Sequence, residues 1–261
     1  MSEPLITLTT DFGEGSAYVA AMKGAIYSII PSVRIVDISH RVAPQDVRMG
    51  ALMLEDATRW FPPGTIHVAV IDPGVGTERP IVFAEIGKQR YIAPDNGLLS
   101  RITLHEPASR IIAVENPRYW HPVVSETFHG RDIMGPVAAH VASGIDPADL
   151  GTALSKIHLI EWPQPQETDH AVTGEIIAVD HFGNLISNIT TEHLGAGDRA
   201  ALKVTCGGRT LAGLRRTYGE EQPGTLVALV GSTERLEVAV VDGNASRELG
   251  LGVGGLIRVD R

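Results

Sequence analysis

The stretch RIVDISHRVAPQDVRMGALMLEDATRWFPPGTIHVAVI, residues 34–71, is typical of a strand, a helix and a second strand. Its apolar runs at 34–39 and 65–71 have the length of buried strands, and a helix-like run separates them. Asp46 stands where an N-cap would begin that helix, and Pro62 would end it. Strands joined through a helix form a crossover connection, so we expect these two to lie parallel in one sheet.

The same alternation continues on both sides of this unit. Further strands are predicted at 5–9, 90–97 and 110–115, and further helices at 17–30 and 131–144. Pro136 lies inside the last of these helices and should kink it. The pattern predicts an α/β N-terminal domain with a mostly parallel sheet and flanking helices.

The pattern changes after a polar, proline-bearing stretch at 161–170. Short apolar runs separated by glycine-rich turns follow it, without helical spacers, and favour a smaller all-β domain, a barrel or a sandwich. We therefore expect an α/β domain at 1–162, a linker at 163–170 and an all-β, barrel-like domain at 171–261.

The composition limits the kind of partner and compartment. The chain has 261 residues and a formal net charge of −9, without a Lys/Arg-rich run, which argues against nucleic acid and anionic membranes as partners. No run of 18 apolar residues and no basic, apolar leader is present. Cys206 is the single cysteine, so no disulfide can form within the chain. We expect a cytoplasmic protein that acts on a small molecule.

Polar side chains follow the first three predicted strands. Asp11, His40 and Asp72 each come directly after a strand, and the carboxyl ends of parallel strands share the edge at which ligands bind. An Asp after a strand is often only a turn or cap residue, but three polar residues in register favour a site. The loop at Asp11 lacks phosphate-loop spacing, and its carboxylate suits ribose hydroxyls.

Two further motifs carry candidate residues. His129 precedes the last predicted helix and would face the same edge, unless it only hydrogen-bonds locally at the helix start. Asp180, Phe182 and Asn184 share one turn that could bind a cationic amine and a flat ring, although a hairpin needs no ligand to explain them. Close His and carboxylate spacing typical of a metal site is missing, and we expect no metal.

Seven segments in order carry a resemblance to a known family. They read TTDFG, YVAAMKGAIYSI, IVDISH, GTIHVAVIDPGVGTER, YIAPDNGLL, TFHGRDIMGPVAAH and VDHFGNLISNI. Together they closely resemble the S-adenosylmethionine hydroxide adenosyltransferases, which are related to the S-adenosylmethionine-dependent fluorinase and chlorinase. The resemblance runs nearly end to end. It implies an α/β N-terminal domain, a barrel-like C-terminal domain and a homotrimer with sites between subunits.

The resemblance also implies the catalytic residues. The family carries an Asp, an Arg and a His around an activated water, and these match Asp72, Arg79 and His129. The halogenases have a tyrosine at the place of Asp72, and the fluorinase has a threonine at the place of Val75. These differences favour hydroxide over halide as the nucleophile.

The family's ligand contacts extend the match to four more residues. Asp11 matches the residue that holds the ribose hydroxyls, and Asp180 and Asn184 match residues that contact the methionine moiety and the adenine. Ser232 matches a further ligand contact in the C-terminal domain. S-adenosylmethionine is then the substrate, and no cofactor is implied.

The reaction expected is hydrolysis of S-adenosyl-L-methionine to adenosine and L-methionine by attack of water at ribose C5′. The sulfonium leaves as a neutral thioether, so the chemical demand falls on the nucleophile. A chlorinase-like halogenase and a non-catalytic module that binds adenosine or S-adenosylmethionine are the alternatives. In the last case Asp72 and Arg79 would form a plain ion pair that braces a turn, worth about 0–1 kcal/mol.

Overall fold

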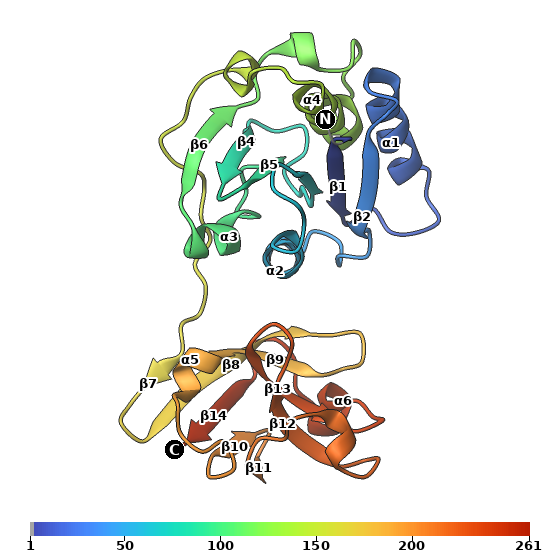
Figure 1. Ribbon diagram of the computed structural model, residues 1–261. Helices are drawn as coiled ribbons and strands as arrows, with labels where there is room; N and C mark the ends of the chain where they lie inside the picture. Colours follow the sequence, from blue (N-terminus) through green and yellow to red (C-terminus); the bar gives the residue numbers. More distant parts are fainter. Residues whose placement is uncertain (1–2) are drawn as a thin grey trace. The chain divides into compact units, whose positions relative to one another are not determined.

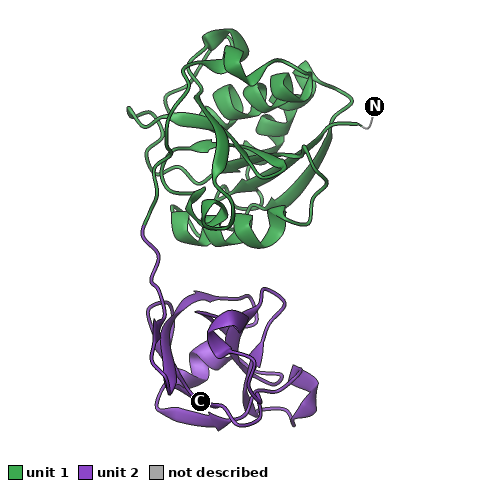
Figure 2. Cartoon of the chain, turned by 60° about the vertical axis from the view of Figure 1, so that its left-hand side comes forward, with its two compact units in different colours: residues 1–160 green, residues 161–261 purple. Residues whose placement is uncertain are grey.

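The computed structural model describes residues 3–261. The chain divides into two compact units, Met1–Ile160 (unit 1) and Glu161–Arg261 (unit 2), drawn in two colours in Figure 2. Residues 163–170, expected as a linker, fall in unit 2, where Gln166 and Glu167 form the short strand β7, paired with β8 (Ala171–Val179).

In the described part of unit 1, six strands form one mixed sheet in the order β2-β1-β3-β5-β4-β6. The strands are β1 (Leu5–Thr10), β2 (Arg34–Ser39), β3 (Ile66–Val70), β4 (Ile81–Ile86), β5 (Gln89–Pro94) and β6 (Ala108–Ala113). The pairs β1–β2, β1–β3 and β3–β5 are parallel, while β4 runs antiparallel to both of its neighbours. The expected mostly parallel sheet is confirmed, with β4 as the one strand that runs the opposite way among those described.

Helices cover both faces of this sheet (Figure 1). They are α1 (Tyr18–Ile29), α2 (Val47–Thr58), α3 (Ser100–His105) and α4 (Gly135–Ala142), with short 3-10 turns at Pro117–Tyr119 and Pro147–Leu150. The Asp46 side chain accepts a hydrogen bond from the Met49 N–H at 2.9 Å, so it caps α2 as predicted.

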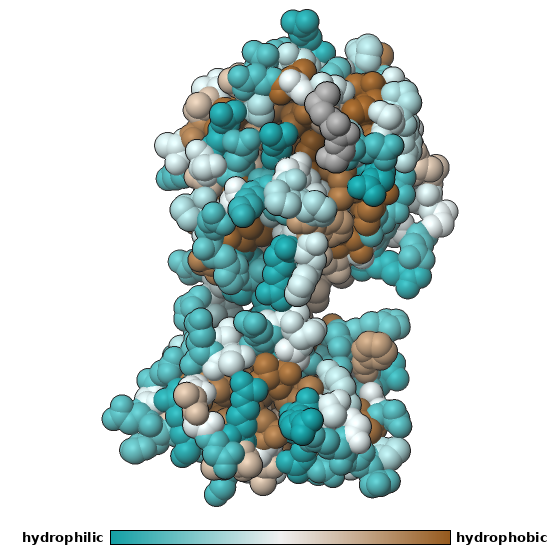
Figure 3. All heavy atoms as spheres, viewed as in Figure 1, coloured by the Kyte–Doolittle hydropathy of each residue, from teal (hydrophilic) through white to brown (hydrophobic). Residues whose placement is uncertain are grey.

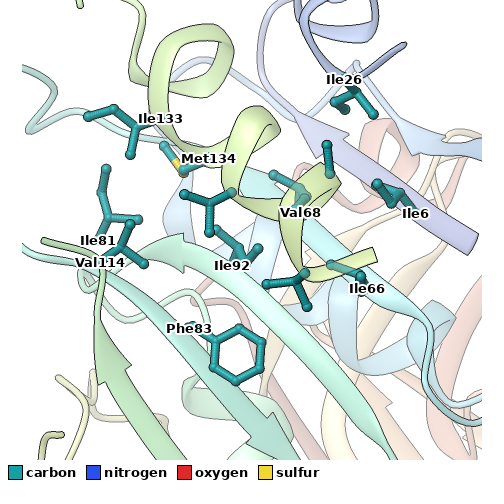
Figure 4. Close-up of a cluster of buried hydrophobic side chains, with 14 of the residues drawn as sticks. Ile6, Ile26, Ile66, Val68, Ile81, Phe83, Ile92, Val114, Ile133 and Met134 are labelled. Atoms are coloured by element: carbon teal, nitrogen blue, oxygen red, sulfur yellow. The ribbon is translucent and has the colours of Figure 1, made fainter. Parts of the chain in front are cut away.

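Alternate residues of the strands pack against opposite helix layers, because successive side chains of a strand point to opposite faces. Val68 and Val70 belong to the core with α1 and α4, whereas Ala69 and Ile71 belong to the core with α2. Figure 4 shows the first of these clusters, where Ile6, Val68 and Met134 lie among other buried side chains.

The helix expected at 131–144 begins differently. A π-helical turn, η2 (Gly130–Met134), precedes α4, and Pro136 occupies the first turn of α4. Helical backbone already precedes this proline, since the Gly135 N–H donates to the Gly130 carbonyl of the π-helical turn. Pro136 therefore lies inside one continuous helical run, just after its π-helical turn, and the expected kink stays a prediction.

Unit 2 is an antiparallel sheet that curls almost into a barrel. Its remaining strands are β9 (Leu185–Thr190), β10 (Lys203–Cys206), β11 (Arg209–Ala212), β12 (Leu226–Val230), β13 (Arg235–Val240) and β14 (Leu256–Asp260). Short helices lie at α5 (Thr191–Leu194), η4 (Tyr218–Glu220) and α6 (Ala245–Leu249). The order is β11-β10-β14-β8-β9-β13-β12, and a bridge between Arg215 and Leu229 links the segment after β11 to β12. The barrel-like all-β domain is confirmed.

The interior of unit 2 is apolar and contains Cys206, whose side chain is almost fully buried. Burial raises the pKa of the Cys206 thiol.

The faces of both units visible in Figure 3 are mostly hydrophilic, with hydrophobic atoms between the polar groups. Among residues 3–261, the helices are too short or too polar to cross a membrane.

Candidate functional site

The loop after β3 brings a carboxylate and a guanidinium together. Arg79 Nε lies 2.9 Å and 3.0 Å from the two carboxylate oxygens of Asp72, and Nη2 lies 2.5 Å from Oδ2. The Asp72 and Arg79 side chains are only 4% and 12% exposed, so water screens this pair weakly. The pair is thus a partly buried, forked contact and differs from the exposed ion pairs of a protein surface.

Gly76 allows this loop to pack against a second segment. Its φ is +78°, a left-handed conformation that side chains rarely adopt, and a Cβ there would collide with the backbone oxygen of Glu126. Turns through Val75 and Thr77, whose N–H groups donate to the carbonyls of Asp72 and Gly74, fold the loop back on itself. The loop therefore lies against the segment that carries His129.

His129 joins the pair through Arg79. Arg79 Nη2 lies 2.8 Å from His129 Nδ1, and a guanidinium can only donate, so Nδ1 accepts this hydrogen bond. The proton of a neutral His129 ring then sits on Nε2. Burial, followed by the nearby positive charge of Arg79, lowers the pKa of His129, which favours this neutral form.

A small cavity of about 60 Å³ in unit 1 lies next to these groups. Its described lining residues are Asp11, Phe12, Val70, Asp72, Val75, Thr127, Phe128, His129 and Gly130. Asp11, Asp72 and His129 thus face one cavity, as their places in the sequence predicted. Arg79 is not among the described residues that line this cavity, but it contacts both Asp72 and His129.

His40, the third residue expected at this edge, has other partners. Its Nδ1 lies 2.9 Å from the Thr10 hydroxyl and its Nε2 lies 3.1 Å from a carboxylate oxygen of Asp37. It is not among the described residues that line the cavity. Asp11 keeps a carboxylate oxygen directed at the Gln45 N–H, at 2.8 Å.

Unit 2 has a cavity of its own, of about 780 Å³, within the range of small-molecule sites. Asp180, Asn184 and Ser232, the three candidate residues of this unit, all line it. Asp180 accepts hydrogen bonds from the backbone N–H groups of Phe182 and Asn184 and from the Asn184 side chain, at 2.8–2.9 Å. These contacts fix the carboxylate at the cavity wall.

Two further residues line this cavity, Tyr218 and Glu237, and the sequence did not indicate either of them. The Tyr218 hydroxyl donates a hydrogen bond of 2.9 Å to the buried carboxylate of Glu237. Burial and the charge of Glu237 raise the pKa of Tyr218, so its hydroxyl stays protonated. A side chain on Gly231 would overlap the Glu237 carboxylate, so this glycine leaves room for the pair. An isolated tyrosine in a loop between two strands carries no local signal of this role.

Among residues 3–261, no group of three or more His, Cys, Asp or Glu side chains is arranged to hold an ion. What the unit 1 site offers is a hydrogen-bond acceptor on Asp72, a donor on His129 Nε2 and a fixed positive charge on Arg79. This combination can orient and deprotonate a water molecule.

Comparisons with known proteins give consistent matches. Family models described as the SAM hydroxide adenosyltransferase N-terminal and C-terminal domains match residues 6–151 and 174–258. Proteins named (R)-S-adenosyl-L-methionine hydrolase from Thermus thermophilus and Salinispora tropica are each 38% identical, over 96% and 98% of this chain and 97% of theirs. A fluorinase from an Actinoplanes species is 30% identical over 78% of this chain and 79% of its own.

A solved structure also resembles the chain. It is described as an uncharacterized conserved protein from Thermotoga maritima, with a TM-score of 0.92 and 34% identity. The alignment covers 98% of this chain and all of that one.

Proposed function

The chain belongs to the SAM hydroxide adenosyltransferase family, and we propose that it is an enzyme that hydrolyses (R)-S-adenosyl-L-methionine to adenosine and L-methionine. The observation that carries this proposal is the continuous contact from Asp72 through Arg79 to His129 at one cavity. Relatives at 35–38% identity over nearly the full chain are named for this activity.

The reaction needs a strong nucleophile. Free water has a pKa of about 15.7, so attack on a carbon requires that its proton be accepted as the bond forms. In the proposed step the water oxygen bonds to ribose C5′, the C5′–S bond breaks and its electron pair stays on sulfur. The water proton passes to Asp72 and then to solvent.

The three residues divide this work. Asp72 accepts from Arg79 on both oxygens, and a carboxylate has about four acceptor positions, so capacity remains for a water. His129 Nε2–H donates to the same oxygen as negative charge develops there. Arg79 acts from behind, because its hydrogen bond to Nδ1 polarises the ring and makes Nε2–H a better donor.

Substrate binding is assigned to the remaining candidates. Asp11 would accept hydrogen bonds from the ribose hydroxyls. The carboxylate of Asp180 would pair with the cationic amine of the methionine moiety, while Asn184 and Ser232 supply polar contacts to the ligand. We propose further that SAM is the substrate of an enzyme without a cofactor, that the protein forms a homotrimer with sites at the subunit interfaces, and that it works in the cytoplasm.

The test is turnover of SAM in water labelled with heavy oxygen, with and without chloride, followed by mass spectrometry. Adenosine with the label on its 5′-oxygen, formed at the same rate in both conditions, supports hydrolysis. Formation of 5′-chloro-5′-deoxyadenosine would instead mean a halogenase. SAM recovered intact with the protein would mean a binding module.

The matched variant is Asp72→Asn, which keeps the shape of the side chain and removes the base. Asp260→Asn serves as control, because Asp260 also pairs with an arginine, Arg258, but lies exposed in β14 and outside both cavities. Hydrolysis should fall only in Asp72→Asn.

A further inference from the structure

The segment from Ser125 to Asp132 holds four residues of the unit 1 cavity, Thr127, Phe128, His129 and Gly130. It runs into η2, whose π-helical turn widens the backbone beside His129. Such turns are uncommon and often occur at functional sites.

Asp132 is the last residue of this segment and holds its C-terminal end in place. Its side chain has no exposed surface, and its two carboxylate oxygens lie 2.6 Å and 2.9 Å from Arg131 Nε and Nη2. The carboxylate also accepts from the Ser125 N–H at 2.9 Å, and the Asp132 backbone oxygen accepts from the His121 N–H at 2.7 Å. A buried carboxylate is tolerated only when it is paired in this way.

Arg131 connects the same carboxylate to the cavity wall. Its guanidinium lies 4.8 Å from the centre of the Phe128 ring, a cation–π distance. The Phe128 ring in turn meets Phe12 and Tyr18 edge-on, at 5.5 Å and 5.3 Å. The pair therefore fixes both the loop start at Ser125 and the ring next to His129.

We propose that the Arg131–Asp132 ion pair is a positioning element that holds His129 in the hydrogen bond with Arg79. Neither residue lines the cavity, so both act through the segment that carries His129. This inference rests on the proposed hydrolysis, and it adds two residues to which no catalytic role is otherwise assigned.

The charge of Asp132 also acts on the pKa of His129. Asp72, Asp132 and Glu126 raise the pKa of His129 and so oppose burial and the charge of Arg79, which lower it. Because Arg79 donates to Nδ1, the working form of His129 is neutral, and activity should fall when the ring is protonated at low pH. Loss of the Asp132 charge should therefore move the acid limb of the pH profile to lower pH.

Two variants test the pair. Asp132→Asn keeps an acceptor for the Ser125 N–H and removes the charge, while Arg131→Lys keeps a cation and removes the fork. In each, kcat for SAM hydrolysis should fall roughly 10- to 100-fold with KM within about twofold, because misplacement affects the step and not the binding groups. Asp260→Asn and Arg258→Lys, in the exposed pair of β14, should leave both constants unchanged.

A readout independent of turnover separates this inference from the proposed function. The His129 ring resonance, assigned by its loss in His129→Gln, should titrate at lower pH in Asp132→Asn than in the parent protein. Unchanged kcat in both variants, or an unchanged His129 titration, would overturn the positioning role. If Asp132→Asn fails to fold, Arg131→Lys with its kcat and KM decides the matter. A parent protein that does not hydrolyse SAM would reject the function, and the titration would still test the pair.

Discussion

Acid should destabilise unit 1 through one buried group, His67. This residue lies in β3 without exposed surface, its Nδ1 2.7 Å from the Thr7 hydroxyl and its ring stacked on Tyr91 at 5.0 Å. Phe61 meets the ring edge-on and the Gln89 amide lies nearby. Burial lowers the pKa of His67 to about 4, because these neutral neighbours cannot replace the water around an imidazolium.

The sign and size of the change in unfolding free energy follow from proton linkage. Between pH 6.5 and pH 4 the unfolded chain binds a proton at this histidine and the folded chain does not, so the free energy of unfolding falls as pH falls. For pKa values of 6.5 and about 4, the loss is about 2 kcal/mol between pH 8 and pH 5 and about 3 kcal/mol once the pH is below 4.

The variant His67→Gln removes the titrating group and keeps a polar side chain. Its absolute stability will differ, so the informative quantity is the change of unfolding free energy between pH 8 and pH 5. Urea unfolding followed by tryptophan fluorescence, in a Trp162→Phe background, reports Trp60 and Trp120 of unit 1. His158→Gln, at an exposed position, is the control.

The parent protein and His158→Gln should each lose about 2 kcal/mol more than His67→Gln over this pH interval. Equal losses in all three proteins would refute the reasoning. They would mean that His67 is protonated in the folded state at ordinary acidity, with water or a counter-charge beside it.

Three other predictions concern the candidate site. Asp72→Asn and Arg79→Lys should each lower the rate of adenosine formation by on the order of 100-fold or more with little change in substrate affinity, measured by steady-state kinetics. Gly76→Ala should lower both activity and the melting temperature, since the left-handed backbone and the nearby Glu126 carbonyl leave no room for a methyl group, at about 1–3 kcal/mol; an unchanged melting curve would contradict this. Asp180→Ala should weaken SAM binding by about 1.5–3 kcal/mol in calorimetry, and an unchanged dissociation constant would remove it from the substrate site.

The alternation of strands and helices in unit 1 could be predicted because each crossover unit contains long apolar runs. Strand β4 could not, since a tight turn at Gly87 and Lys88 joins it to β5 and no helix separates the two. Helix α3 has only six residues, too few for a helical period to stand out.

In the candidate site, too, the sequence predicts some residues and misses some contacts. The sequence places Asp11 and Asp72 at one edge because both follow parallel strands. Arg79 and His129 are 50 positions apart in the sequence, and their contact depends on the left-handed turn at Gly76. A sequence motif does not tell how far apart two such residues lie in the folded chain. Tyr218 and Glu237 meet across a loop and a strand of unit 2, where only tertiary packing joins them.

The buried thiol of Cys206 makes the chain its own chemical probe. A thiol reagent can attack only when unit 2 opens enough to expose β10, because the folded protein both shields the sulfur and disfavours its thiolate. The labelling rate of Cys206 therefore reports the opening of unit 2 alone, while tryptophan fluorescence in the Trp162→Phe background follows unit 1. Substrate analogues could then be sorted by which half of the chain they protect.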